Sequence, residues 1–184
     1  DPPYNRPPLS KSLWKGDAVD TIWRKPTDKK SICHRHRLAT FLDPEKKQVR
    51  DASGGTYSWE KLLLATGGVP RKLAAGNDHI IYFRTLDDYR RLRTVTEKGQ
   101  RFAVIGGGFI GSEIAAALSI NQKKVVMIFP GENLGDRVFP QSLAEFVSKF
   151  YREKGVELLA GEKVSGLEAR GDQLVVKTSS AREI

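Results

Sequence analysis

The glycine-rich segment 101–118 constrains the fold of this chain more than any other part. Five residues of strand character, 101–105, lead into Gly106, Gly108 and Gly111, and a helical pattern follows at once. This strand–turn–helix context is what a dinucleotide-binding turn requires. The first glycine would allow a tight turn, the second would let a pyrophosphate approach the backbone, and the third would let the helix pack closely on the strand. The alternative is a plain glycine-rich turn without a ligand.

The rest of the chain alternates between strand and helix patterns. Strands are expected at residues 31–42, 47–51, 56–59, 61–66, 101–105, 124–129, 156–160, 164–170 and 173–178, and further helices at 87–97 and 141–154. The first three strands indicate a small antiparallel meander, and the continuous apolar run 61–66 is typical of a strand that is buried on both faces. Ser10 is expected to cap a short helix that starts near Lys11.

The order of elements predicts an α/β fold. From residue 101 onward, strand, helix, strand, helix and strand follow one another, which is half of a Rossmann-like, doubly wound parallel sheet. The helix at 141–154 is amphipathic, and one stripe is expected to carry Leu143, Phe146, Val147, Phe150 and Tyr151.

Composition places the chain among ordinary globular proteins and limits the chemistry available to it. Of the 184 residues, 39% are hydrophobic and 29% charged, and no apolar run is long enough to cross a membrane. Cys33 is the only cysteine, which excludes a disulfide framework, and a buried, inert thiol is expected. No metal site is predicted, since His34, His36 and His79 lack ligand spacing.

The net charge of +9 leaves a nucleic-acid interaction open as a secondary property. Solvated basic faces and contacts to an anionic cofactor explain the same excess of charge.

Three motifs give the chain a family resemblance. They are Pro-Tyr-Asn-Arg-Pro-Pro-Leu-Ser-Lys at 3–11, Leu-Ala-Thr-Gly-Gly-Val-Pro-Arg at 64–71, and the glycine turn together with the segments 128–130 and 151–157. The chain resembles the flavoproteins with two dinucleotide-binding domains, the pyridine nucleotide-disulphide oxidoreductase superfamily. Within it, the chain is most similar to the branch of apoptosis-inducing factor, its bacterial relatives and the ferredoxin-reductase-like enzymes. The resemblance implies that residues 1–98 form part of an FAD domain and residues 99–184 an NAD(H) domain.

The resemblance also implies a catalytic pair. The segment carrying Arg6 and Lys11 would line the flavin, and Glu113 would pair with Lys11 from the first turns of the helix after the glycines. Such a pair would hold a positive charge beside the flavin. Without the motif context, Lys11 is an ordinary solvated lysine and Glu113 an acid near a helix start.

Further cofactor contacts are implied in the same way. Beside the flavin the family places the residues that match Ala65, Thr66, Gly67 and Arg71, and beside the nicotinamide those that match Phe109 and Ile110. For Phe109 and Ile110 the alternative is ordinary packing between helix and sheet.

The acid that binds the adenosine ribose is expected at the end of the second strand. Relatives with Phe-Pro-Glu carry it at the position of Gly131, whereas here Glu132 comes one residue later. We expect Glu132 to bind the ribose, and the absence of an adjacent arginine favours NADH over NADPH.

Two family motifs are missing from the sequence: the earlier glycine unit that binds the FAD pyrophosphate and the later Gly-Asp motif. The sequence is therefore expected to be the central part of a longer flavoprotein that uses FAD and NAD(H). The family's Cys-x4-Cys pair is also absent, which favours direct transfer from flavin to an acceptor, either a protein or a small molecule.

The alternative functions are an NAD-binding remnant and an interaction or nucleic-acid-binding protein, both with little catalysis. Homodimerisation stays open. The compartment stays open as well, between a bacterial cytoplasm and an organelle such as the mitochondrion.

Overall fold

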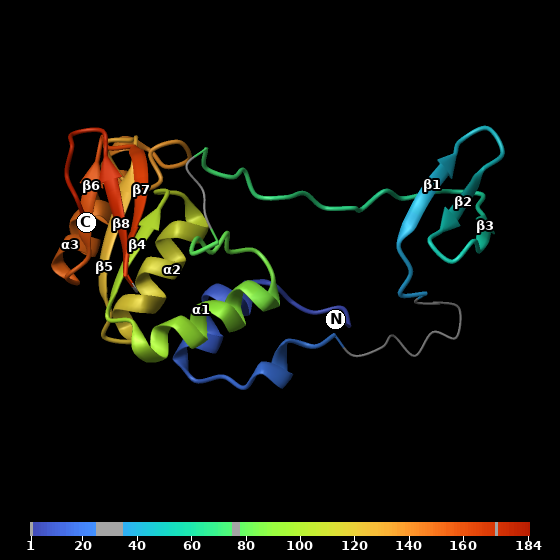
Figure 1. Cartoon of the computed structure of the whole chain (residues 1–184), viewed down its shortest axis with the longest axis horizontal. Helices are drawn as coiled ribbons and strands as arrows, with labels where there is room; N and C mark the ends of the chain where they lie inside the picture. Colours follow the sequence, from blue (N-terminus) through green and yellow to red (C-terminus); the bar gives the residue numbers. More distant parts are fainter. Residues whose placement is uncertain (1, 25–34, 75–77, 172) are drawn as a thin grey trace. The chain divides into compact units, whose positions relative to one another are not determined.

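The computed structural model describes residues 2–24, 35–74, 78–171 and 173–184. The chain divides into two compact units (Figure 1). Unit 1 comprises Asp1–Arg24 and Pro70–Ile184, and unit 2 comprises Lys25–Val69. Each unit is described by itself.

A parallel three-stranded sheet forms the centre of unit 1. Its strands are β4 (Arg101–Ile105), β5 (Lys124–Phe129) and β6 (Glu157–Ala160), in the order β4-β5-β6. The crossovers contain α2 (Phe109–Ile120) and α3 (Gln141–Glu153). This arrangement confirms the predicted α/β fold with a parallel sheet.

The central strand β5 is buried on both faces because successive side chains point to opposite sides. Val125, Met127 and Phe129 pack into the larger core, which also contains residues of α2. Val126 and Ile128 pack on the other face. The predicted hairpin forms from β7 (Val164–Arg170) and β8 (Gln173–Thr178), and it covers this second face, which was not predicted.

The N-terminal segment belongs to the same core. It forms three short 3-10 helices, η1 (Pro7–Ser10), η2 (Ser12–Lys15) and η3 (Val19–Ile22). Its buried apolar side chains, Leu9, Leu13, Trp14 and Ile22, pack with α1 (Leu86–Lys98) and α2. Ser10 caps no helix, contrary to the prediction, because its hydroxyl group has other partners.

Helix α1 confirms the prediction for 87–97 and starts at a capping box. The Thr85 side chain accepts a hydrogen bond from the Asp88 backbone, and the Asp88 side chain accepts one from the Thr85 backbone. Two of the backbone N–H groups at the helix start are thereby satisfied.

Unit 2 is the predicted antiparallel meander. It consists of β1 (Ala39–Asp43), β2 (Gln48–Asp51) and β3 (Thr56–Ser58), paired in sequence order. The first strand is shorter than expected, since residues 35–38 form no strand and residues 31–34 lie outside the described part.

Two predictions about burial are wrong. Residues 61–66 form no strand, and their leucines are exposed, with Leu63 at 86%. A strand that is buried on both faces needs neighbouring strands to take up its backbone hydrogen bonds, and no described strand pairs with 61–66. On α3 the expected single stripe is divided, because Val147 and Tyr151 pack against the core whereas Leu143, Phe146 and Phe150 are exposed.

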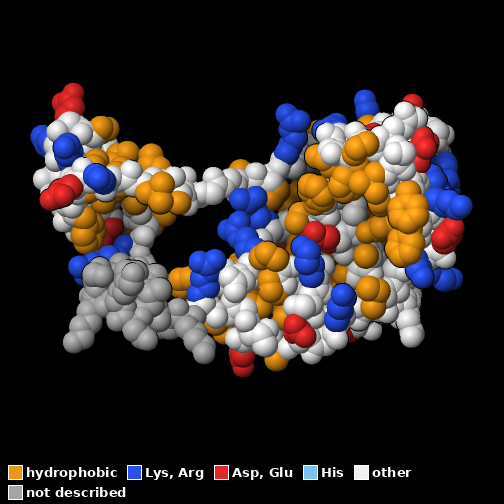
Figure 2. All heavy atoms as spheres, turned by 180° about the vertical axis from the view of Figure 1, so that it is seen from behind, with side chains coloured by type: hydrophobic (Ala, Val, Ile, Leu, Met, Phe, Trp, Pro, Cys, Tyr) orange, Lys and Arg blue, Asp and Glu red, His pale blue; other side chains and the backbone are white. Residues whose placement is uncertain are grey.

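Apolar side chains gather on one face of unit 1 in Figure 2. Across the described residues, no helix combines the length and the hydropathy that a membrane crossing needs. The proposed domain boundary at residue 98 stays a prediction.

Candidate functional site

The glycine turn lies between the carboxyl end of β4 and the start of α2. Gly106 has a φ of +115°, a conformation that side chains disfavour, and its N–H donates to the Ile128 carbonyl at 2.9 Å. Gly108 is the residue directly before α2, and a Cβ added there would have no atom within 4 Å. The backbone at Gly108 is therefore open to a ligand, and the unpaired N–H groups of the helix start follow it.

Gly111 lies where α2 packs on the turn. A Cβ at this position would overlap the Gly106 carbonyl oxygen and come within 3.1 Å of the carbonyl carbon. Only glycine lets the helix approach the turn this closely. The three glycines thus have the three geometries expected of a dinucleotide turn: positive φ, open backbone and close packing.

Gly107 also lacks room for a side chain, because a Cβ there would lie 2.8 Å from Cγ of Phe129. Its carbonyl accepts a hydrogen bond from the Gly135 N–H at 2.9 Å. The turn is therefore tied to the loop 130–140 that follows β5, a link that the spacing of the glycines could not reveal.

Lys11 and Glu113 meet in the structure. Nζ of Lys11 lies 2.8 Å from Oε1 of Glu113, with the two side chains 52% and 26% exposed. The sequence places these residues more than a hundred positions apart, and packing of the η1–η2 segment on α2 brings them together.

Ser10 is a third member of this group. Its buried hydroxyl donates to the other carboxylate oxygen, Oε2 of Glu113, at 2.6 Å. The Glu113 carboxylate is thus held by one cation and one hydroxyl. From the sequence, Ser10 was expected to cap a helix, and only its position next to Lys11 pointed towards this role.

Tyr151 of α3 lies beside the same carboxylate. Its hydroxyl donates to the Ser112 carbonyl at 3.0 Å, one residue before Glu113. Burial raises the pKa of Tyr151, and the negative charge of Glu113 raises it further. Tyr151 therefore fixes the first turns of α2 while remaining neutral.

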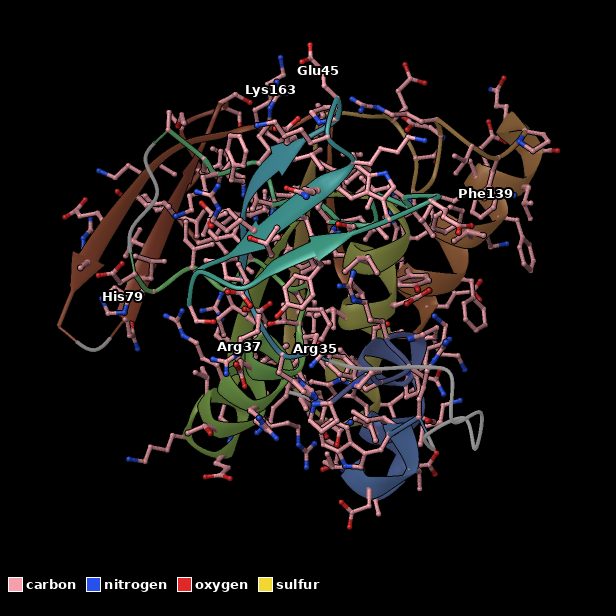
Figure 3. All side chains as sticks on the ribbon, turned by 90° about the vertical axis from the view of Figure 1, so that its right-hand side faces the viewer. Arg35, Arg37, Glu45, His79, Phe139 and Lys163 are labelled. Carbon is pink, nitrogen blue, oxygen red and sulfur yellow. The ribbon has the colours of Figure 1, made fainter. Side chains whose placement is uncertain are left out.

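Phe109 and Ile110 lie on the exposed side of the helix start. Their side chains are 57% and 50% exposed, so ordinary packing between helix and sheet does not account for them. The Phe109 ring meets the Phe139 ring edge-on at 5.7 Å. Phe139, labelled in Figure 3, lies two residues before the start of α3.

The remaining predicted cofactor residues are divided between the two units. Arg6 precedes η1 and is exposed, and Arg71 is an exposed residue of unit 1. Ala65, Thr66 and Gly67 belong to unit 2, and Gly67 has a φ of +73°. Glu132 is exposed in the loop after β5.

No metal centre is present within the described ranges, since no three His, Cys, Asp or Glu side chains there are placed to hold an ion. Cys33 and His34 lie outside the described residues. The candidate site therefore consists of the glycine turn, the Ser10–Lys11–Glu113 group and the loop after β5.

The chain is similar in sequence and structure to known proteins of one family. Terpredoxin reductase from a Pseudomonas species is 34% identical over 174 residues, which cover 88% of this chain and 41% of that protein. Apoptosis-inducing factor 1 of Dictyostelium discoideum is 31% identical over 186 residues, covering 86% of this chain and 35% of that protein. The chain thus spans about two fifths of the length of the curated relatives it matches.

A ferredoxin reductase from Rhodopseudomonas palustris has a similar solved structure. It superposes with a TM-score of 0.92 at 27% identity, over all of this chain and 47% of that one. The family model described as pyridine nucleotide-disulphide oxidoreductase matches residues 1–184. The chain belongs to the pyridine nucleotide-disulphide oxidoreductase family.

Proposed function

We propose that this chain forms the NAD(H) site and the flavin-facing Lys11–Glu113 pair of an FAD-dependent NADH:acceptor oxidoreductase. The observation that carries the proposal is the glycine turn, where open backbone at Gly108 stands next to an unpaired helix start. The flavin and the nicotinamide supply the hydride transfer itself when they are bound.

The turn fits a dinucleotide pyrophosphate. Gly108 leaves space for the phosphates, and the first N–H groups of α2 and the helix dipole favour an anion at that point. Phe109 and Ile110, exposed at the same helix start, offer an apolar surface along which the nicotinamide arm can lie. NADH is the expected dinucleotide and NADPH the less favoured one.

Lys11 would hold a positive charge at the flavin. Because Glu113 pairs with its ammonium group, and Ser10 in turn holds the Glu113 carboxylate, the lysine enters the site already oriented. Arg6, Arg71, Ala65, Thr66 and Gly67 are proposed to complete the flavin side by resemblance to the family, with residues 1–98 forming part of the FAD domain.

The acceptor is proposed to be a separate redox partner and not a disulfide of this chain, since Cys33 has no second cysteine. Terpredoxin reductase and putidaredoxin reductase are among the relatives, which supports a small electron-transfer protein as that partner.

Direct binding tests the proposal. The purified chain is titrated with NADH and, separately, with FAD, with nicotinamide fluorescence and flavin absorbance as the measurements. We expect saturable NADH binding that Gly108→Val abolishes, because the added side chain fills the open backbone site. NADH binding that Gly108→Val leaves unchanged would place the ligand elsewhere and contradict the assignment. FAD binding would show that the flavin side also functions within these residues.

A further inference from the structure

The carboxyl end of β5 is where a fold of this type recognises the adenosine ribose. Gly131 is the second residue after β5, and by the family resemblance it corresponds to the acid of relatives with Phe-Pro-Glu. From the sequence, the next residue, Glu132, is the expected ribose ligand. The structure points to a different carboxylate.

The side chain of Asp136 occupies the space in front of Gly131. A Cβ added to Gly131 would overlap Oδ2 of Asp136 and lie 2.6 Å from its Cγ and 2.8 Å from its Oδ1. The Asp136 carboxylate therefore lies where a side chain of residue 131 would begin. A residue other than glycine at 131 would displace it.

The loop that carries Asp136 is fixed at the glycine turn. The side chain of Leu134 is fully buried, and its N–H donates to the buried Oγ of Ser148 at 2.8 Å. The next N–H, that of Gly135, donates to the Gly107 carbonyl of the turn at 2.9 Å. Asp136 follows directly, so its backbone is held relative to the pyrophosphate site.

The Asp136 carboxylate is available as an acceptor. Within the described part of the chain, the side chains of Asp136 and Glu132 make no hydrogen bond and no ion pair, and both residues are exposed. What distinguishes them is position: Asp136 fills the place of the side chain at 131, whereas Glu132 does not.

We propose that Asp136, and not Glu132, supplies the carboxylate that accepts hydrogen bonds from the adenosine ribose hydroxyls, and that Gly131 is needed to make room for it. The assignment rests on the proposed function of the glycine turn. A carboxylate there binds the free 2′-hydroxyl of NADH and repels the 2′-phosphate of NADPH. Asp136 thus favours NADH, whereas Arg137, the next residue, would favour a 2′-phosphate, so variants of both residues are needed to determine which one selects the dinucleotide.

The first experiment measures the affinities of the full chain for NADH, NADPH and ADP-ribose by calorimetry. Asp136→Asn is expected to weaken NADH binding at least about tenfold, because hydrogen bonds to a charged acceptor are lost, and to narrow the preference over NADPH. Asp20→Asn, an exposed aspartate of η3, is the matched control and should change neither affinity. The assignment would be overturned if Glu132→Gln lost affinity for NADH while Asp136→Asn kept the affinity of the wild-type chain.

A second set of variants tests the role of Gly131 independently. Gly131→Ala should displace the Asp136 carboxylate and weaken NADH binding as Asp136→Asn does. The amide NMR spectrum should show that unit 1 remains folded. In an Asp136→Ala background, Gly131→Glu should restore the preference for NADH by supplying the carboxylate at position 131 itself. Failure of this restoration in a folded variant counts against the proposal.

Failure of the ribose assignment can be distinguished from failure of the proposed function. If the wild-type chain binds NADH and Asp136→Asn has no effect, only the ribose assignment fails. If the wild-type chain binds neither dinucleotide nor ADP-ribose, the proposed function and the assignment fail together. Preferential NADPH binding that Arg137→Ala abolishes would assign the loop to 2′-phosphate recognition instead.

Discussion

The two units of this chain are stabilised by different kinds of interaction. All buried apolar residues found in the structure belong to unit 1, where the helices and the hairpin cover the two faces of the parallel sheet. In the described residues of unit 2, the one buried side chain is that of Asp51, a charged residue.

Asp51 organises the turn between β2 and β3. Its Oδ1 accepts hydrogen bonds from the Ser53 N–H, the Ser53 hydroxyl and the Gly55 N–H, and its Oδ2 accepts one from the Tyr57 hydroxyl at 2.8 Å. These hydrogen bonds, chiefly those from the Ser53 and Tyr57 side chains, lower the pKa of Asp51 to about 2. Shape complementarity of apolar groups therefore dominates unit 1, and a polar network dominates unit 2.

The largest effect is expected from overpacking unit 1. Gly111→Ala places a methyl group against the Gly106 carbonyl, so the first turn of α2 must move away from the sheet. We expect the free energy of unfolding to fall by about 3 kcal/mol. Urea unfolding followed by amide spectra measures the change, and the resonances of unit 2 should not move.

Gly108→Ala is the matched control for this prediction. Its Cβ meets no atom within 4 Å, and its φ of −86° suits alanine, so stability should change by less than about 0.5 kcal/mol while NADH affinity falls. Equal destabilisation by the two substitutions would show that packing against Gly106 is not what position 111 requires.

The second prediction concerns the stability of unit 2 at low pH. Because folding lowers the pKa of Asp51, its contribution to stability is present above the ordinary value of 3.8 and is lost as the pH falls through about 2. The amide resonances of β2 and β3 should therefore lose their chemical-shift dispersion over this pH range. In the Asp51→Asn variant, the same resonances should lack this dispersion already at neutral pH. Unit 1 resonances that collapse at the same pH would show that the two units do not differ in this way.

The structure of unit 1 was easier to predict from the sequence than that of unit 2, because its local patterns agree with its tertiary contacts. Strand β5 and the glycine turn have local patterns, a continuous apolar run and a fixed spacing, that agree with their tertiary contacts. The run 61–66 has an equally strong local pattern, but a strand forms only where a partner is available, and none of the described strands pairs with it.

The site was predictable where a local motif marked it and not where distant segments meet. The glycines and the Lys11–Glu113 pair followed from motifs. The bond from Ser10 to Glu113 and the placement of Asp136 at Gly131 did not, because each depends on contacts between segments that no spacing encodes.

A third, smaller effect is expected at the Lys11–Glu113 pair, for which we proposed a place beside the flavin. Ser10→Ala removes a buried hydroxyl from the Glu113 carboxylate and should destabilise unit 1 by about 1–2 kcal/mol. Lys11→Ala removes a half-exposed ion pair and should cost less than about 1 kcal/mol. Thermal unfolding compares the two, with Ser10→Thr as the variant that keeps the hydroxyl; a larger cost for Lys11→Ala contradicts this ranking.

The last prediction concerns Tyr151 at alkaline pH. Burial and the Glu113 charge raise its pKa above the ordinary value of 10, so its contribution to the stability of unit 1 is fully present below pH 10 and is lost as the pH rises through the raised pKa. Tyr151→Phe removes the hydrogen bond to Ser112 and should cost about 1 kcal/mol at neutral pH, a difference that shrinks in alkali. The chain with Tyr151 and the Tyr151→Phe variant are both compared in a Tyr57→Phe background, because the pKa of Tyr57 is also raised, by its hydrogen bond to Asp51.

Tyrosinate absorbance in a Glu113→Gln variant completes the test. The titration of Tyr151 should shift to lower pH, and an unchanged titration would mean that burial alone keeps this tyrosine neutral.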